Sequence, residues 1–229
     1  MICTIHQPNY LPYSGFFEKM SNADITILYD NTQFKKNDFQ NRNRIRLKEK
    51  GIWLTVPVSY HFGDLINQVK INNNTPWTKQ HWKSIQLNYF KAPYFNDYKA
   101  EFENVYSKRW DKLVDINVTL IKLCSGLLKL KTKIVLASDL TNLQTKSTDA
   151  LLTLCKAVKC DEYISGVDGK KYLELDKFAK SGIKVRFQDY KHPVYKQVYP
   201  GFEPYMSVID MLFNCGPDCL EILKKDNTY

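Results

Sequence analysis

The sequence opens with a polar segment whose residue types suit acid–base chemistry. His6 follows a short apolar run, and Pro8 and Pro12 restrict the backbone of the segment that comes after it. A histidine held in this way can accept a proton near neutral pH, which makes His6 a candidate general base. A lone histidine more often has only a structural hydrogen-bonding role, so both interpretations stay open.

Two further residues suit the same chemistry. His192 lies beside Pro193 after a predicted strand, and we expect it to be a second candidate base. Asp30 ends another predicted strand and could orient a hydroxyl, a cation or a metal-bound phosphate. A turn formed by the Asp30 side chain is an equally good interpretation.

The chain has 28 lysines but only five arginines, and three of these, Arg42, Arg44 and Arg46, fall within five residues. A guanidinium group binds phosphates and carboxylates through two parallel hydrogen bonds, which a lysine cannot do. The cluster therefore indicates an anion site. The alternative is a strand with a charged outer face, because the arginines alternate with other residues.

Polar loops at the ends of predicted strands supply the remaining candidates. One loop, Ser165 to Tyr172, contains two glycines and a lysine before a helix, where backbone N–H groups can face an anion. The candidate binding residues are Gln7, Asn9, Tyr10, Tyr13, Gln33, Asn41, Arg42, Asn43, Arg44, Ser165, Gly166, Gly169, Lys170, Tyr172, Tyr195 and Gln197.

Composition limits the class of protein. The formal net charge is +9, but the lysines are scattered singly, so we expect a solvated surface and not a nucleic-acid footprint. No apolar run approaches the ~18 residues that span a bilayer. No secretory signal is visible at the first residues, so we expect a cytoplasmic protein.

The six cysteines form no Cys-x-x-Cys pair, and the four histidines are not spaced near them as zinc ligands usually are. We therefore expect reduced, buried thiols and no bound metal.

The pattern of apolar residues predicts the elements that position these side chains. A strand over 2–5, a helix over 14–22 and a strand over 24–30 form a βαβ unit. Further strands are expected over 52–58, 65–71, 133–138, 162–165 and 183–187, and helices from 75 and over 109–129, 147–159 and 173–181, with Ser207 and Asp210 as a reciprocal helix cap. The prediction is an α/β fold with a single mostly parallel sheet and flanking helices, Rossmann-like. We expect one domain over 1–229, with 73–130 as a largely helical insertion or subregion.

The motifs resemble those of the WbqC-like family, found among O-antigen and surface-polysaccharide genes. The matching residues are His6-Gln7-Pro8-Asn9-Tyr10-Leu11-Pro12-Tyr13, Gly15-Phe16-Phe17, Asp30, Gln33-Phe34, Asn41 to Ile45, Ser165-Gly166, Gly169, Tyr172-Leu173, His192-Pro193, Tyr195, Gln197, Phe202, Pro204, Ser207 and Asp210. The resemblance implies glycine transfer to an amino sugar of a polysaccharide precursor.

The start of the chain is also similar to pantothenate synthetase, an adenylate-forming amide ligase of the nucleotidylyltransferase fold. This weaker likeness implies that ATP is a possible cofactor. Tyr13-Ser14-Gly15-Phe16 stands where that family has His-x-Gly-His, so both signature histidines are absent.

Together these indications predict a transferase that attaches glycine or another small acyl group to the amine of a nucleotide-linked amino sugar. Arg42 and Arg44 would bind the diphosphate, amides would bond sugar hydroxyls, and His6 or His192 would deprotonate the ammonium, because an ammonium has no lone pair with which to attack. The acyl donor could be glycine with ATP, a thioester or a charged tRNA. The alternatives are an ATP-dependent amide ligase and a non-catalytic nucleotide-sugar-binding protein.

Overall fold

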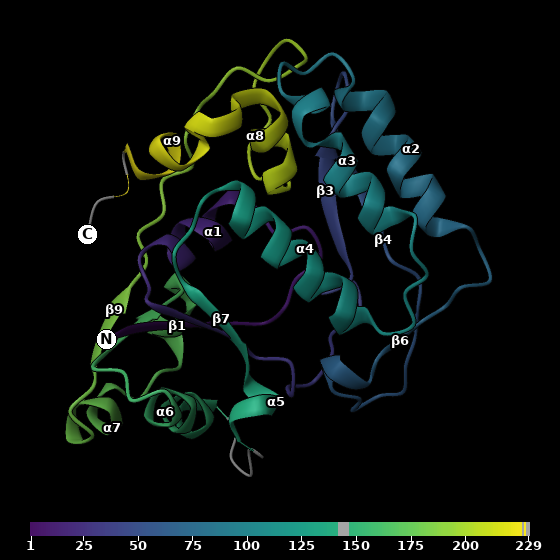
Figure 1. Ribbon diagram of the computed structural model, residues 1–229. Helices are drawn as coiled ribbons and strands as arrows, with labels where there is room; N and C mark the ends of the chain where they lie inside the picture. The colour runs from purple at the N-terminus through teal and green to yellow at the C-terminus, as the bar shows by residue number, and fades with distance from the viewer. Residues whose placement is uncertain (142–146, 226, 228–229) are drawn as a thin grey trace.

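The computed structural model describes residues 1–141, 147–225 and 227 (Figure 1). Its centre is a sheet of five parallel strands in the order β7, β2, β1, β8, β9. The strands are β1 (Ile2–His6), β2 (Ile25–Leu28), β7 (Lys133–Leu136), β8 (Glu162–Ser165) and β9 (Lys184–Phe187). The predicted α/β fold with a parallel sheet is confirmed.

Helices cover both faces of the sheet, as the apolar character of its strands requires. On one face, Cys3 and Ile5 of β1 pack in a hydrophobic cluster with α6 (Ser147–Ala157) and α7 (Leu175–Lys180). On the other, α1 (Ser14–Ser21) and α4 (Leu113–Leu127) belong to a larger cluster. Figure 1 shows these two layers on opposite sides of the strands.

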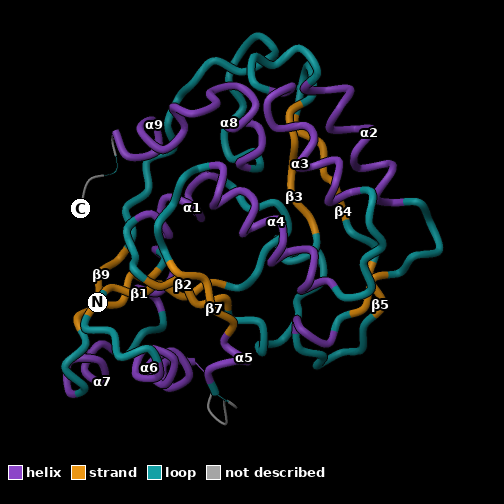
Figure 2. Tube along the Cα trace, viewed as in Figure 1, coloured by secondary structure: helices purple, strands orange, loops and turns teal. Residues whose placement is uncertain are grey.

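A second part of the fold lies beside the sheet and carries two small antiparallel strand pairs, β3 with β4 and β5 with β6 (Figure 2). Helices α2 and α3 pack against each other next to them. The remaining elements are β3 (Arg42–Arg46), β4 (Gly51–Thr55), β5 (Val58–Ser59), β6 (Lys70–Ile71), α2 (Trp77–Tyr89), α3 (Phe95–Tyr106), α5 (Ala137–Leu140), α8 (Val208–Cys215), α9 (Cys219–Lys225), η1 (Ile66–Gln68), η2 (Val167–Lys171) and η3 (Gly216–Asp218).

The structure corrects several expected elements. The strand expected over 65–71 is η1 followed by a two-residue strand, because Ile66 N and Asn67 N donate to Thr32 and Asp30 instead of to a neighbouring strand. Most of the strand expected over 52–58 is β4, and it pairs with β3. Helix α3 had no expected range of its own, but it lies in the stretch 73–130 that was expected to be largely helical. Residues 142–146, which lie between the strand predicted over 133–138 and the helix predicted over 147–159, are outside the described residues.

Two further points concern the whole fold. When the five parallel strands are numbered along the chain, their order across the sheet is 3-2-1-4-5. The direction in which successive strands are added therefore reverses between β1 and β8. The Rossmann-like, nucleotidylyltransferase-like and single-domain assignments stay predictions. Within the described residues, no helix has the length and apolar character needed to cross a membrane.

Candidate functional site

At the carboxyl ends of the parallel strands, the loop after β1 and the segment after β9 lie beside the end of β8. In open parallel sheets a ligand crevice forms beyond these ends, where the strand order reverses. Here that place lies between β1, which ends at His6, and β8, which ends at Ser165. The loop from β1 leads into α1, and the segment 188–207 runs from β9 over the top of the molecule to α8 (Figure 1).

The first turn of α1 contacts segment 188–207 directly. The Ser14 hydroxyl shares a hydrogen bond of 2.5 Å with the Tyr190 hydroxyl and lies 3.4 Å from His192 Nε2. A Cβ at Gly15 would lie within 3 Å of the rings of Tyr13 and Tyr190, so this helix start accepts only glycine without displacing a ring. Close packing therefore fixes the start of α1 against the segment.

His192 is the centre of this contact. Its Nε2 accepts the Tyr205 N–H at 3.1 Å, so the ring proton is on Nδ1, which donates to the Pro193 carbonyl at 2.8 Å. Burial lowers the pKa of His192, and the Pro193 carbonyl opposes that shift. The imidazole is therefore neutral near pH 7, and its Nε2 could accept a proton only after it releases the Tyr205 N–H.

Tyr205 occupies a strained backbone conformation beside this histidine. Its φ is +58°, which costs a non-glycine residue of order 1–3 kcal/mol. Its ring is more than half exposed and lies 5.1 Å from the His192 ring and 6.5 Å from Tyr13. The bond from Tyr205 N to His192 holds this conformation, and the aromatic ring stays at the surface next to the histidine.

A buried carboxylate organises the rest of the segment. Asp210 is inaccessible to solvent and accepts hydrogen bonds from Tyr89 at 2.9 Å and from Tyr195 and Gln197 at 2.8 Å each. Burial raises its pKa against these donors. Ser207 caps α8 as expected, but the predicted reciprocal bond from Asp210 is wrong, because this carboxylate bonds the three other side chains instead.

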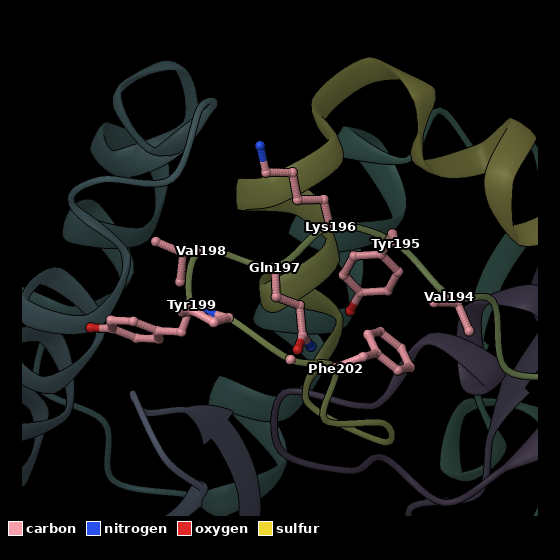
Figure 3. A pocket seen from close by; sticks show the side chains of 9 residues that line it. Val194, Tyr195, Lys196, Gln197, Val198, Tyr199 and Phe202 are labelled. Carbon is pink, nitrogen blue, oxygen red and sulfur yellow. The ribbon is translucent and has the colours of Figure 1, made fainter.

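An open pocket of about 680 Å³ lies along residues 194–202. Figure 3 shows the side chains of Tyr195, Gln197 and Phe202 close together, while Lys196 points away from them. The Phe202 ring lies 5.6 Å from His192, which connects the pocket to the start of α1. The volume is in the range that small-molecule sites occupy.

Strand β3 borders the same region. The Arg44 carbonyl accepts the Ser207 N–H at 2.8 Å, and the Arg44 guanidinium lies 3.5 Å from Glu203. Arg42 stacks over the exposed Trp53 ring at 4.4 Å, and its Nε has no acceptor within the part of the chain that the structure describes. The arginines therefore form a charged strand face in which the unpartnered Arg42 Nε is buried, and an anion site at this face stays a prediction.

These segments correspond to a known family. The profile of the WbqC-like protein family matches residues 7–222. The chain belongs to the WbqC-like family. It is 32% identical over 224 residues to the uncharacterized protein Rv1507c of Mycobacterium tuberculosis (strain ATCC 25618 / H37Rv), covering 96% of each chain. No solved structure matches.

His6 has contacts different from those of His192. Its ring packs edge-on against Phe16 at 4.5 Å, and its Nδ1 lies 3.0 Å from the Gln7 carbonyl. Desolvation, and then the charge of Lys19, lower its pKa to about 3. No hydrogen bond or ring contact among the described residues joins His6 to His192.

Asp30 is also separate from His192. Its carboxylate is buried and accepts hydrogen bonds from Ser138 N at 3.0 Å, Ser138 Oγ at 2.6 Å and Asn67 Nδ2 at 3.2 Å. These bonds tie the end of β2 to the start of α5 and to η1.

Several predicted binding residues have structural partners. Tyr10 is fully buried and bonds His81 and Tyr106, Asn41 donates to Val56, and Asn43 donates to Leu11. Gln7 accepts from Gln40, and Asn9 is buried. Gln33 is exposed and forms an isolated bridge with Leu65.

The loop after β8 contains both buried and exposed side chains. Ser165 is buried and donates to the Gly166 carbonyl, while Lys170 lies over the Phe187 ring at 5.6 Å and Tyr172 is about half exposed. A Cβ at Gly169 would clash with Ser165 Oγ, but one at Gly166 would meet open space. Packing therefore accounts for Gly169.

Sequence reasoning missed three residues at this edge. Lys19 is buried, donates to the Ile5 carbonyl at 3.3 Å, and has a pKa that desolvation lowers to about 8. Gln188 donates to the Gly15 carbonyl at 2.7 Å and to the buried Glu18. A lysine and a glutamate inside the apolar pattern of the helix over 14–22 were the available signal.

Proposed function

We propose that this WbqC-like chain is a transferase that forms an amide between glycine, or another small acyl group, and the amine of a nucleotide-linked amino sugar in surface-polysaccharide precursor biosynthesis. The observation that carries the proposal is the junction of three features. The neutral imidazole of His192 lies beside an open pocket of about 680 Å³, and a face with two arginines lies next to that pocket.

The arginine face suits the nucleotide part of such a substrate. Arg42 and Arg44 both lie against Trp53, with guanidinium-to-ring distances of 4.4 and 5.8 Å. Guanidinium groups bind a diphosphate through paired hydrogen bonds, and an exposed indole can stack on a base. A bound diphosphate would replace Glu203 as the partner of Arg44.

The amine must be deprotonated before it can form a bond to the acyl carbon, and the acyl carbon then loses its leaving group, which is AMP after activation by ATP, a thiol from a thioester, or tRNA. His192 is the better placed histidine, because it contacts the pocket residue Phe202 and is partly exposed. Its Nε2 would release the Tyr205 N–H and take the ammonium proton. His6 and Asp30 remain second candidates, but a pKa of about 3 makes the His6 imidazole a weak base.

The test is mass spectrometry of nucleotide-linked amino sugars incubated with the protein and glycine plus ATP, a glycyl thioester or glycyl-tRNA. A mass gain of one glycyl unit supports the transferase. Dependence on free glycine with ATP would support the amide-ligase alternative. Binding of the sugar without product from any donor would support the non-catalytic binding protein.

Matched histidine variants test the role of the base. His192→Gln should lower turnover by about a hundredfold, because a general base contributes on that order. His61→Gln is the control, since the His61 side chain is 96% exposed and pairs with Asp64, which is three residues away in the sequence. Equal turnover of the two variants would remove His192 from the chemistry.

A further inference from the structure

Three of the six cysteines converge at a place remote from the proposed site. Cys3 Sγ lies 2.9 Å from Cys160 Sγ and 3.6 Å from Cys155 Sγ, and the three sulfurs all lie within 4.8 Å of one another. None of the three is in a disulfide, and all are buried. Spacing along the chain did not reveal this group, because Cys3 comes from a strand more than 150 residues away.

The fold builds this group from two secondary elements and a turn. Cys155 is in the last part of α6, and the turn that follows brings the Cys160 N–H to within 3.1 Å of the Cys155 carbonyl. Lys159 closes that turn with a φ of +55°. Cys3 joins them because it is the register partner of Tyr163 in β8, three residues after Cys160.

The composition of the group favours one class of ligand. Thiolate sulfur is a soft donor that selects Cu(I), Zn(II) and iron–sulfur centres. Structural zinc is almost always four-coordinate, and within the described residues no carboxylate or imidazole ligand atom joins the three sulfurs. The three cysteines belong to the apolar cluster of α6, α7 and β1, and the carboxylate of the neighbouring Asp161 pairs with the N-terminal amine. A cation that accepts three sulfur ligands fits this group best.

We propose that Cys3, Cys155 and Cys160 form a three-coordinate thiolate site for Cu(I), at the amino ends of β1 and β8. Binding releases the thiol protons of the three cysteines to solvent and forms three metal–sulfur bonds, and no electron is transferred. The site is independent of the proposed transferase, because the amino ends of these strands lie at the opposite edge of the sheet from His6 and Ser165.

A disulfide is the main competing explanation for the short contact between Cys3 and Cys160. It would use two sulfurs and leave the third without a role, whereas a metal site uses all three. The two explanations differ in what the protein retains under reducing conditions, since only a metal would remain bound there.

The experiment uses the full chain, purified and kept reduced without oxygen, and titrates it with the Cu(I) complex of bicinchoninate. The chain should withdraw one Cu(I) from this coloured chelator, measured as the loss of the chelator's colour. X-ray absorption should show sulfur ligands only. Cys160→Ser should weaken binding at least tenfold, as should Cys3→Ser and Cys155→Ser.

Two variants serve as controls. Cys124→Ser changes another buried cysteine, and Cys215→Ser breaks the neighbouring pair Cys215 and Cys219; both should bind copper as the unaltered chain does. Because Cys3 and Cys155 are fully buried, their variants could unfold, so thiol alkylation of the unaltered chain provides a second measurement. Alkylation of the buried Cys3, Cys155 and Cys160 requires the fold to open locally, so copper should slow it further and leave the rate at Cys215 unchanged.

Three results would overturn the proposal: no copper withdrawn from the chelator, equal affinity in Cys160→Ser, or loss of binding in Cys215→Ser alone. Formation of a disulfide between Cys3 and Cys160 without retained metal would also overturn it. None of these outcomes depends on transferase activity.

Discussion

Asp30 and Asp210 are both buried carboxylates, and they are held in different ways. Asp30 accepts bonds from a rotatable hydroxyl, a backbone N–H and one amide. Asp210 accepts from two tyrosines and from Gln197, whose amide also donates to the Glu203 carbonyl while its oxygen accepts the Glu203 N–H. Gln197 therefore cannot reorient without losing both bonds, whereas the Ser138 hydroxyl beside Asp30 can.

This difference has a consequence for the site. Asp30 anchors the end of one strand, but Asp210 anchors a 20-residue segment with no helix or strand of its own, from Gln188 to Ser207. The pocket and His192 both belong to that segment. We therefore expect the site to depend more on Asp210 than on Asp30.

The largest expected effect is that of Asp210→Asn. The new amide can keep its oxygen toward Tyr195 and Gln197, but its nitrogen then faces the Tyr89 hydroxyl, which already accepts the Arg46 N–H and loses its own acceptor. Burying an unsatisfied donor costs about 1–3 kcal/mol, so we expect a loss of about 3 kcal/mol in the free energy of unfolding. Urea denaturation measures it, and turnover should fall with it. A loss below about 1 kcal/mol would contradict the proposed anchoring role.

The pH dependence of this loss follows from the pKa of Asp210. Burial raises that pKa above 3.8, so at a pH between the two values the folded chain binds a proton that the unfolded chain does not. The stability that Asp210 contributes is therefore complete below 3.8 and falls as pH rises through the raised pKa. Asparagine does not titrate there.

Comparing the two chains isolates this single group, because their other ionisable residues are shared. Urea midpoints from about pH 3.5 to about pH 6 should show the stability gap between the unaltered chain and Asp210→Asn narrowing as pH rises. A gap that widens would mean that the three hydrogen bonds outweigh burial.

A smaller effect is expected of Asp30→Asn. Its retained oxygen can still accept Ser138 N, and the Ser138 hydroxyl can turn to accept the new amide, so only the contact with Asn67 becomes unfavourable. We expect a loss of about 1 kcal/mol. If Asp30 acts in catalysis, turnover falls far more than this stability loss explains, and the comparison between the two carboxylates must be revised.

The same contrast explains what could be predicted from the sequence. The parallel sheet was predictable because Ile25 to Leu28 and the other strands are apolar runs with local β propensity. The segment from 188 to 207 was not, because its order comes from bonds between Tyr195, Gln197 and Asp210 and from Tyr89, 121 residues from Asp210. The amides of Asn41 and Asn43 were assigned to a ligand because their carbonyl partners in the fold leave no local signal.

The smallest stability effect, and the sharpest test of the arginine face, is expected of Arg44→Lys. Arg44 is partly exposed and its contact with Glu203 is 3.5 Å, so the free energy of unfolding should change by no more than about 0.5 kcal/mol. Lysine keeps the charge but loses the two-bond geometry that a diphosphate needs. The affinity for a nucleotide-linked amino sugar, measured by calorimetry, should therefore fall on the order of tenfold.

Arg109→Lys is the matched control, because Arg109 is exposed and pairs with Asp111 at 3.1 Å. It should leave the affinity unchanged. Since both substitutions keep the charge, equal losses would indicate an unspecific effect of replacing a surface guanidinium and would remove Arg44 from the diphosphate site. A loss confined to Arg44→Lys that persists in salt requires a directional contact, since screening weakens exposed point charges but leaves the shape of the guanidinium group unchanged.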